Sequence, residues 1–205
     1  MKIIPKPCLT LCGFILLGVL LTGCPKKVVK MPPVEVPVVK NPVNMLLETF
    51  SVADNFQSRA SIRFETVTKG ERLNFLLNGS VLFQKPDRLR ILGYHPFGME
   101  LFDALYRDGQ FFLLNTPEKK AYTGEIQEFE DLIEKARVQI STETPPGSLI
   151  PNRIRIGVQE NQTRIDLRLK EILVNGSLPE DAFRWYVPEG VQVMPLARLV
   201  RKNPS

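Results

Sequence analysis

The stretch ASIRFETVTKGERLNFLLNGSVLFQKPDRLRIL, which runs from Ala60 to Leu92, decides the fold. Its residues alternate between apolar and polar, a period of two that is typical of a β-strand with one buried face. A turn at Lys69-Gly70 and another at Lys85-Pro86-Asp87 divide the alternation into three parts. The apolar positions are Ala60, Ile62, Phe64, Leu73, Phe75, Leu77, Val81, Phe83, Leu89 and Ile91. The pattern predicts a hairpin of two long, half-buried strands that is followed by a third strand.

Two other segments have helical spacing. Apolar residues recur every three or four positions between Leu46 and Phe56, and again between Gly124 and Val138. In the second segment the acidic residues come early and the basic residues come late, as the helix dipole favours. We therefore expect one helix before the hairpin and another in the middle of the chain.

The segments on either side of the second helix return to strand periodicity. A turn at 95–98 and another at 107–109 bound two strands, and residues 111–114 are apolar on both faces, which predicts a strand that is covered on each side. After a loop at 141–152, alternation predicts further strands up to a last one over Phe183, Trp185 and Val187. A change of parity at Lys170-Glu171 indicates a β-bulge. These elements predict a mainly β (α+β) fold: one large, curved antiparallel sheet whose inner face is covered by the two helices.

The first 23 residues have the pattern of an export signal. A charge-free apolar run from Cys8 to Leu21 is shorter than the roughly 20 residues that a membrane-spanning helix needs. The next residues, LTGC at 21–24, resemble the bacterial lipobox, whose cysteine is lipidated and becomes the first mature residue. A proline-rich segment then predicts an extended tether. We expect a signal peptide over 1–23, a lipidated Cys24 with its tether over 24–44, a globular domain over 45–194 and a basic tail over 195–205.

The composition argues against several functional classes. Removal of the two lysines of the leader lowers the formal charge from +5 to +3, which does not support a nucleic-acid footprint. Cys24 would be the last cysteine, so an internal disulfide and a cysteine-based metal site are excluded. His95 is the single histidine, and no P-loop, dinucleotide fingerprint or zinc-protease motif occurs. We therefore expect no enzyme, no metal and no cofactor apart from the covalent lipid.

The order of the segments resembles the lipoprotein-localisation carrier and receptor superfamily (LolA/LolB-like). The similar pieces are ASIRF with GSVLFQKPDRLRIL, then HPFG with DGQFFLLNTPEKKAYTG, then LKEILVNGSLPEDAFRWYVPEGVQV, and together they span Gln57 to Val193. The resemblance implies an unclosed half-barrel with helices on its concave side and acyl chains held in the cavity between them. Eight apolar residues would line such a cavity: Phe64, Phe75, Phe83, Leu89, Ile91, Ile156, Leu167 and Trp185.

The lipobox favours the membrane-anchored receptor branch of this superfamily. HPFG is also similar to the receptor's Pro-Leu-Gly loop, in which an apolar side chain inserts into lipid, and Phe97 stands at that position in place of leucine. The resemblance implies reception or transfer of lipoproteins or lipids at the periplasmic face of the outer membrane, with a soluble periplasmic carrier as a partner.

The residues alone leave four alternatives open. The eight apolar residues can be ordinary core packed against the helices, and Phe97 can fold back beside Phe102. The protein can also be an anchored envelope scaffold or assembly subunit that uses the same fold without lipid cargo. Pro25 follows the cysteine, where enteric bacteria use aspartate for inner-membrane retention, so either membrane is compatible with the sequence.

Overall fold

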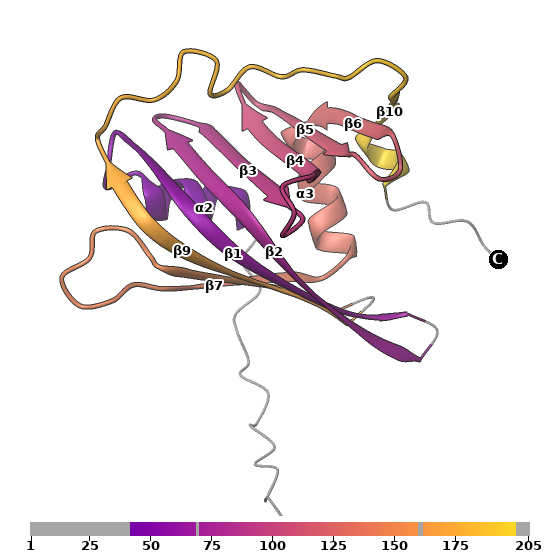
Figure 1. Cartoon of the computed structure of the whole chain (residues 1–205), viewed down its shortest axis with the longest axis horizontal. Helices are drawn as coiled ribbons and strands as arrows, with labels where there is room; N and C mark the ends of the chain where they lie inside the picture. Colours follow the sequence, from indigo (N-terminus) through magenta and orange to yellow (C-terminus); the bar gives the residue numbers. More distant parts are fainter. Residues whose placement is uncertain (1–41, 69, 160–161, 200–205) are drawn as a thin grey trace, which may run out of the picture. The chain divides into compact units, whose positions relative to one another are not determined.

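The computed structural model describes residues 42–68, 70–159 and 162–199. Within these residues a single ten-stranded sheet has the order β10-β6-β5-β4-β3-β2-β1-β9-β8-β7 (Figure 1). The strands are β1 (Asn55–Thr68), β2 (Glu71–Gln84), β3 (Arg88–Tyr94), β4 (Glu100–Arg107), β5 (Gln110–Asn115), β6 (Lys120–Glu125), β7 (Val138–Glu143), β8 (Arg153–Val158), β9 (Thr163–Val174) and β10 (Gln192–Pro195). The edge strands β10 and β7 do not pair with each other, so the prediction of a mainly β fold with one large, unclosed sheet is confirmed.

The hairpin of β1 and β2 is the longest pairing in the sheet. Its register runs without interruption from Asn55 opposite Gln84 to Thr68 opposite Glu71. By contrast, β3 reaches only as far as Tyr94 opposite Asn78, so the far part of β2 has no neighbour on its outer side among the described residues. Because these strands alternate in direction, the turns β1–β2, β3–β4, β5–β6 and β8–β9 all lie at one end of the sheet, which we call the hairpin end.

Two α-helices, α2 (Pro42–Phe50) and α3 (Ile126–Lys135), pack on the same face of the sheet (Figure 1). Phe50 of α2 contacts the rings of Phe56 and Phe83 at centroid distances of 4.9 and 5.7 Å. Phe129 of α3 stacks on Phe111 of β5 at 4.1 Å. We call this side of the sheet the helix face and the other side the opposite face.

After β9 the chain crosses the sheet to its far edge, where β10 lies, and this step was not expected from the sequence. Residues 176–191 contain no strand, and they run along the opposite face before β10 begins. We call these residues the crossing segment. β10 then runs along the far edge of the sheet in the same direction as β6 and pairs with it in parallel. The predictions of a strand over 183–187 and of a wholly antiparallel sheet were therefore wrong.

The helix boundaries also differ from the prediction. α2 ends at Phe50, Ala53 lies in a turn and Phe56 belongs to β1, although Ala53 and Phe56 are as deeply buried as Phe50. A stripe of buried residues therefore continues from helix into strand, which is why periodicity alone placed the helix end too late. α3 ends at Lys135, so β7 begins at Val138, within the segment predicted to be helical. The short strands β6, β7 and β10 were not predicted.

Two finer predictions are confirmed. The register between β1 and β9 shifts opposite Gln57 and Arg59, and Glu171 has a positive φ of 52° there, as the parity change at Lys170-Glu171 indicated. β5 is covered on both sides, since Phe111 faces α3 while Phe112 packs beneath the crossing segment. A 3₁₀ turn, η1 (Leu196–Arg198), follows β10 and buries Leu196, so ordered structure continues past residue 194.

Candidate functional site

Seven of the eight residues predicted to line a cavity share the helix face. The register shows this directly, because Phe64 lies opposite Phe75, and Phe83 lies opposite Leu89. They differ in what covers them. Phe83, Leu89 and Leu167 are buried in the core beneath the helices, the remaining residues are partly buried, and Phe75 is 47% exposed. The helix face thus combines a close-packed region with an uncovered one.

Trp185 does not belong with the other seven. It lies in the crossing segment on the opposite face, where its ring packs against Phe112 at 5.3 Å. Phe183 is buried in the same cluster with Leu105. Alternation within 183–187 made these residues look like one more strand of the same face, but the segment is held against the sheet by its side chains and not by strand pairing.

The uncovered region of the helix face lies at the hairpin end. α2 has nine residues and β1 has fourteen, so at the usual rises per residue the helix spans about 14 Å and the strand about 46 Å. Among the described residues, no helix extends over the part of the hairpin that lies next to the β1–β2 turn. Phe64 and Phe75 form a ring pair there at 6.3 Å, and Leu73 beside them is 37% exposed.

A second exposed apolar group lies in the β3–β4 turn, also at the hairpin end. Phe97 is 92% exposed and Met99 is 60% exposed. The turn is closed by a hydrogen bond from the Gly98 N–H to the His95 carbonyl at 2.8 Å, and Gly98 has a φ of 89°, which favours glycine. The ring of His95 lies 5.0 Å from that of Phe97. Phe97 therefore projects from the turn, and the alternative that it packs back beside Phe102 is wrong.

The opposite face holds a buried ion pair that the sequence analysis missed. Arg90 on β3 donates from Nε and Nη2 to the two carboxylate oxygens of Asp103 on β4, at 2.9 and 2.7 Å. The third donor, Nη1, bonds the Ala182 carbonyl of the crossing segment at 2.8 Å. These hydrogen bonds to Asp103 raise the pKa of Arg90. A signal was present, since Asp103 is the one charged residue in the otherwise mostly apolar stretch from Leu101 to Tyr106.

The crossing segment is fastened at a second point and roofs two recesses. Arg107 on β4 donates from Nη1 to the Phe183 carbonyl at 2.7 Å. One recess of about 600 Å³ lies beside Arg90, between Leu82, Leu92 and Ala182. The other, of about 410 Å³, is more polar and is lined by three arginines together with Asp108 and Glu180. Burial also raises the pKa of Glu100, the first residue of β4.

The remaining predictions about sites concern metals and the membrane. Cys24 lies outside the described residues, so its lipidation stays a prediction. Within the described residues, no group of three or more His, Cys, Asp or Glu side chains is placed to hold a metal ion. No described helix combines the length and the apolar character needed to cross a bilayer.

Comparisons with known proteins give structural neighbours only. Neither the protein-family models nor the curated proteins include a match. Among solved structures, the chain is similar to an uncharacterized conserved protein from Thermus thermophilus, with 12% identity, a TM-score of 0.42, and coverage of 74% of this chain and 98% of that one. It is also similar to a DUF1329 family protein from Desulfovibrio piger, with 9% identity, a TM-score of 0.39, and coverage of 69% and 95%.

A third neighbour is a LolA superfamily protein from Nitrosomonas europaea, with 11% identity, a TM-score of 0.35, and coverage of 69% of this chain and 96% of that one. A LolA superfamily structure is thus among the solved structures to which this chain is similar.

Proposed function

We propose that this protein is a lipid-anchored protein of the bacterial envelope that binds acyl chains on its helix face and receives or transfers lipoproteins or lipids. The observation that carries this proposal is the uncovered apolar surface at the hairpin end. Leu73 and Phe75 expose their side chains on the helix face, and the partly buried Phe64 and Ile165 connect them to the core. In this proposal the helix face is the concave side of a half-barrel.

The physical basis is the gain from removing apolar surface from water. Contiguous exposed apolar surface is uncommon on soluble monomers and marks sites of interaction. Each methylene of an acyl chain that leaves water contributes about 0.8 kcal/mol. A chain that covers Leu73 and Phe75 would gain this free energy and would also shield the two side chains. The site therefore needs no polar recognition group and accepts the acyl chains of lipoproteins or of lipids.

Phe97 supports a delivery step at the same end of the sheet. Insertion of one phenylalanine side chain into lipid is worth about 2 kcal/mol, which suits a transient contact. Met99 projects from the same turn and adds to this contact. Because the β3–β4 turn and the uncovered hairpin lie at one end, contact of Phe97 with a bilayer would bring the acyl chains close to their destination.

The anchor and the partners complete the proposal. A lipidated Cys24 followed by an extended tether would hold the domain at the periplasmic face of the outer membrane, and a soluble periplasmic carrier would bring the cargo. The role is binding and transfer, with no catalytic step and no cofactor besides the lipid on Cys24.

Acyl binding is tested on the full chain with palmitate that carries a fluorophore. The Phe75→Glu variant places a charge on the uncovered surface, and we expect it to weaken binding by at least about tenfold, since a charge against an acyl chain is strongly unfavourable. Val52→Glu is the matched control, because Val52 is 56% exposed and lies at the other end of the sheet. This variant should bind the probe as the wild type does. Absence of probe binding by the wild type, or equal binding by Phe75→Glu, contradicts the proposal.

The delivery step is tested by transfer of a bound lipoprotein into liposomes. We expect Phe97→Glu to keep cargo binding and to slow transfer, while Leu149→Glu, in an exposed loop at the other end, leaves the rate unchanged. Thermal unfolding of both variants serves as the check on folding. Normal transfer by a stable Phe97→Glu variant would remove Phe97 from the mechanism.

A second candidate function is an anchored envelope scaffold without lipid cargo. The observation that favours it is the close packing of Phe83, Leu89 and Leu167 beneath the helices. This alternative requires that the purified full chain carries no extractable lipid and does not bind the acyl probe. The Phe75→Glu experiment therefore distinguishes the two functions.

A further inference from the structure

The opposite face of β9 and β1 carries a group of exposed basic side chains. Register with buried partners places them there: Ile62 opposite Leu167 points to the helix face, so their neighbours along each strand point away from it. We call these four residues the basic face: Arg63, Arg164, Arg168 and Lys170. All four are exposed, and none has an ion pair within the described residues.

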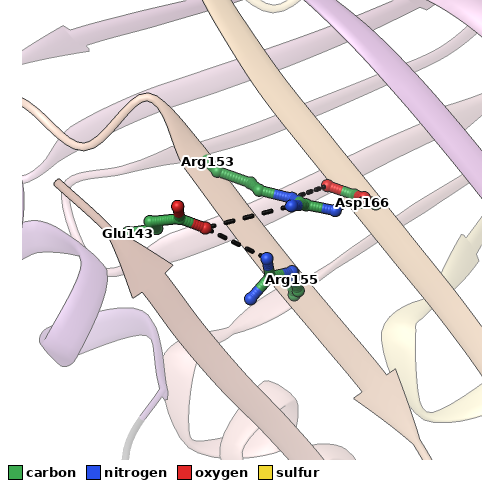
Figure 2. A network of polar contacts seen from close by, with 4 residues as sticks. All are labelled: Glu143, Arg153, Arg155 and Asp166. Atoms are coloured by element: carbon green, nitrogen blue, oxygen red, sulfur yellow. Dashed lines mark hydrogen bonds and ion pairs between the residues drawn. The ribbon is translucent and has the colours of Figure 1, made fainter. Parts of the chain in front are cut away.

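Two carboxylates on this side of the sheet, those of Asp166 and Glu143, are engaged by arginines outside the basic face. Figure 2 shows Arg153 of β8 between the carboxylates of Asp166 and Glu143, with Arg155 also directed at Glu143. Arg155 Nη2 lies 3.0 Å from Glu143 Oε2, and Arg153 bonds both oxygens of Asp166. Because these acids are satisfied within the sheet, they leave the four cations of the basic face available to an external anion.

One cation of the basic face, Arg168, also lies next to another positive charge within the sheet. Arg168 lies directly opposite Arg153 on β8, and like charges directly opposite each other destabilise a sheet. On its other side Arg168 faces Ser61, which offers no charge. Glu65 lies opposite Arg164 and is the one acid of β1 beside the group. An external anionic partner would relieve this repulsion.

The surroundings of the basic face fit a membrane surface better than a pocket ligand. Leu76 lies on the same face directly opposite Arg63 and is 58% exposed, and Leu173 of β9 is 57% exposed. Exposed cations on neighbouring strands, with exposed leucines at the margins of the group, match the headgroup and upper acyl regions of an anionic bilayer. Arg164 lies near the start of β9, at the same end of the sheet as the Phe97 turn.

The other side of the molecule has the opposite sign. The exposed side of α3 carries Glu128, Asp131 and Glu134. An anionic surface would repel this helix and attract the basic face, so the charge distribution selects one orientation of the domain. We propose that the basic face, with Leu76 and Leu173, docks on the headgroups of anionic phospholipids. This contact needs no acyl cargo on the helix face.

The test measures how the full chain distributes between two kinds of vesicle. Equal amounts of phosphatidylcholine vesicles and of vesicles that also contain phosphatidylglycerol are mixed with the protein and then separated. The N-terminal segment, which carries lysines of its own, is the same in every variant, so a difference in the ratio between variants reports the folded domain. The wild type should favour the anionic vesicles, and added salt should reduce this preference.

The decisive variant is Arg164→Glu with Arg168→Glu. Each cation near an anionic surface contributes about a fivefold preference, so the double reversal should reduce the ratio by at least about tenfold. Its matched control is Lys135→Glu with Arg198→Glu, which changes the net charge equally on exposed residues outside the basic face. This control should keep the wild-type ratio within about twofold.

Two results would overturn the proposal. One is a wild type that binds both vesicles equally, which would leave the basic face to an acidic protein partner. The other is an equal loss in both double variants, which would mean that net charge alone determines binding. Thermal unfolding checks that both variants fold, and Arg164→Gln with Arg168→Gln provides a milder change that should give an intermediate ratio. The probe-binding experiment with Phe75→Glu is independent of this ratio, so failure of acyl binding and failure of docking are distinguishable.

Discussion

Replacement of Arg90 by leucine is the most informative test of how the crossing segment is held. Arg90 is 17% exposed in its side chain, and Asp103 is only 4% exposed. Removal of one partner from a buried pair usually costs about 3 to 5 kcal/mol, because the other charge stays behind without compensation. The lost hydrogen bond to the Ala182 carbonyl adds to this cost. We expect Arg90→Leu to lower the free energy of unfolding by about 4 kcal/mol.

A double-mutant cycle separates the pair from its surroundings. Asp103→Leu should cost about 1 to 2 kcal/mol, because Arg90 keeps its bond to the Ala182 carbonyl and its guanidinium is already partly exposed to solvent. The double variant should cost about 2 kcal/mol, since an apolar pair replaces two charges and only the Ala182 carbonyl is left without its donor. The expected coupling between the two positions is therefore about 3 to 4 kcal/mol in magnitude.

Denaturant unfolding gives these free energies, and the fluorescence of Trp185 gives a local signal. Trp185 is the single tryptophan, and it packs against Phe112 close to the Ala182 and Phe183 carbonyls that Arg90 and Arg107 bind. Release of the crossing segment should therefore shift its emission toward that of an exposed indole. A loss below about 1 kcal/mol for Arg90→Leu, or additive losses in the cycle, would refute this reasoning.

The remaining predictions concern the anchor, the core and the acid end of the pH range. Cys24→Ser should give an unprocessed or soluble product, and mass spectrometry of membrane-retained protein with an unmodified Cys24 would contradict the anchor. Leu89→Asp should unfold the domain or destabilise it by several kcal/mol, whereas Phe75→Asp should change the unfolding midpoint little, because only Leu89 is buried. Hydrogen bonds from Arg153 hold the pKa of Asp166 below its usual value of 3.8. This pair therefore stabilises the fold above pH 3.8 and loses its contribution as the pH falls through the lower pKa of the folded state. We expect Asp166→Asn to flatten the dependence of the free energy of unfolding on pH in that acid range, as measured by denaturant unfolding.

Local sequence determined the faces of the strands and the shape of several turns. Alternation in Ala60–Leu92 assigned the correct residues of β1, β2 and β3 to one face, because successive side chains of a strand must point to opposite sides. The parity change at Lys170-Glu171 located the bulge for the same reason. Gly98 after Phe97 indicated a tight turn, since glycine adopts a positive φ without a steric penalty.

Tertiary structure alone decided what covers each face. Phe75 and Phe83 follow the same alternation in one strand, yet Phe83 is fully buried and Phe75 is 47% exposed. The difference arises from the short α2, which directly precedes β1 in the chain and packs on only one part of the hairpin. Trp185 and the parallel pairing of β10 depend in the same way on the path of the crossing segment. Alternation with a period of two shows which residues share a side of a strand. Burial depends on which other element packs on that side and how far it extends, and this is a property of the assembled chain.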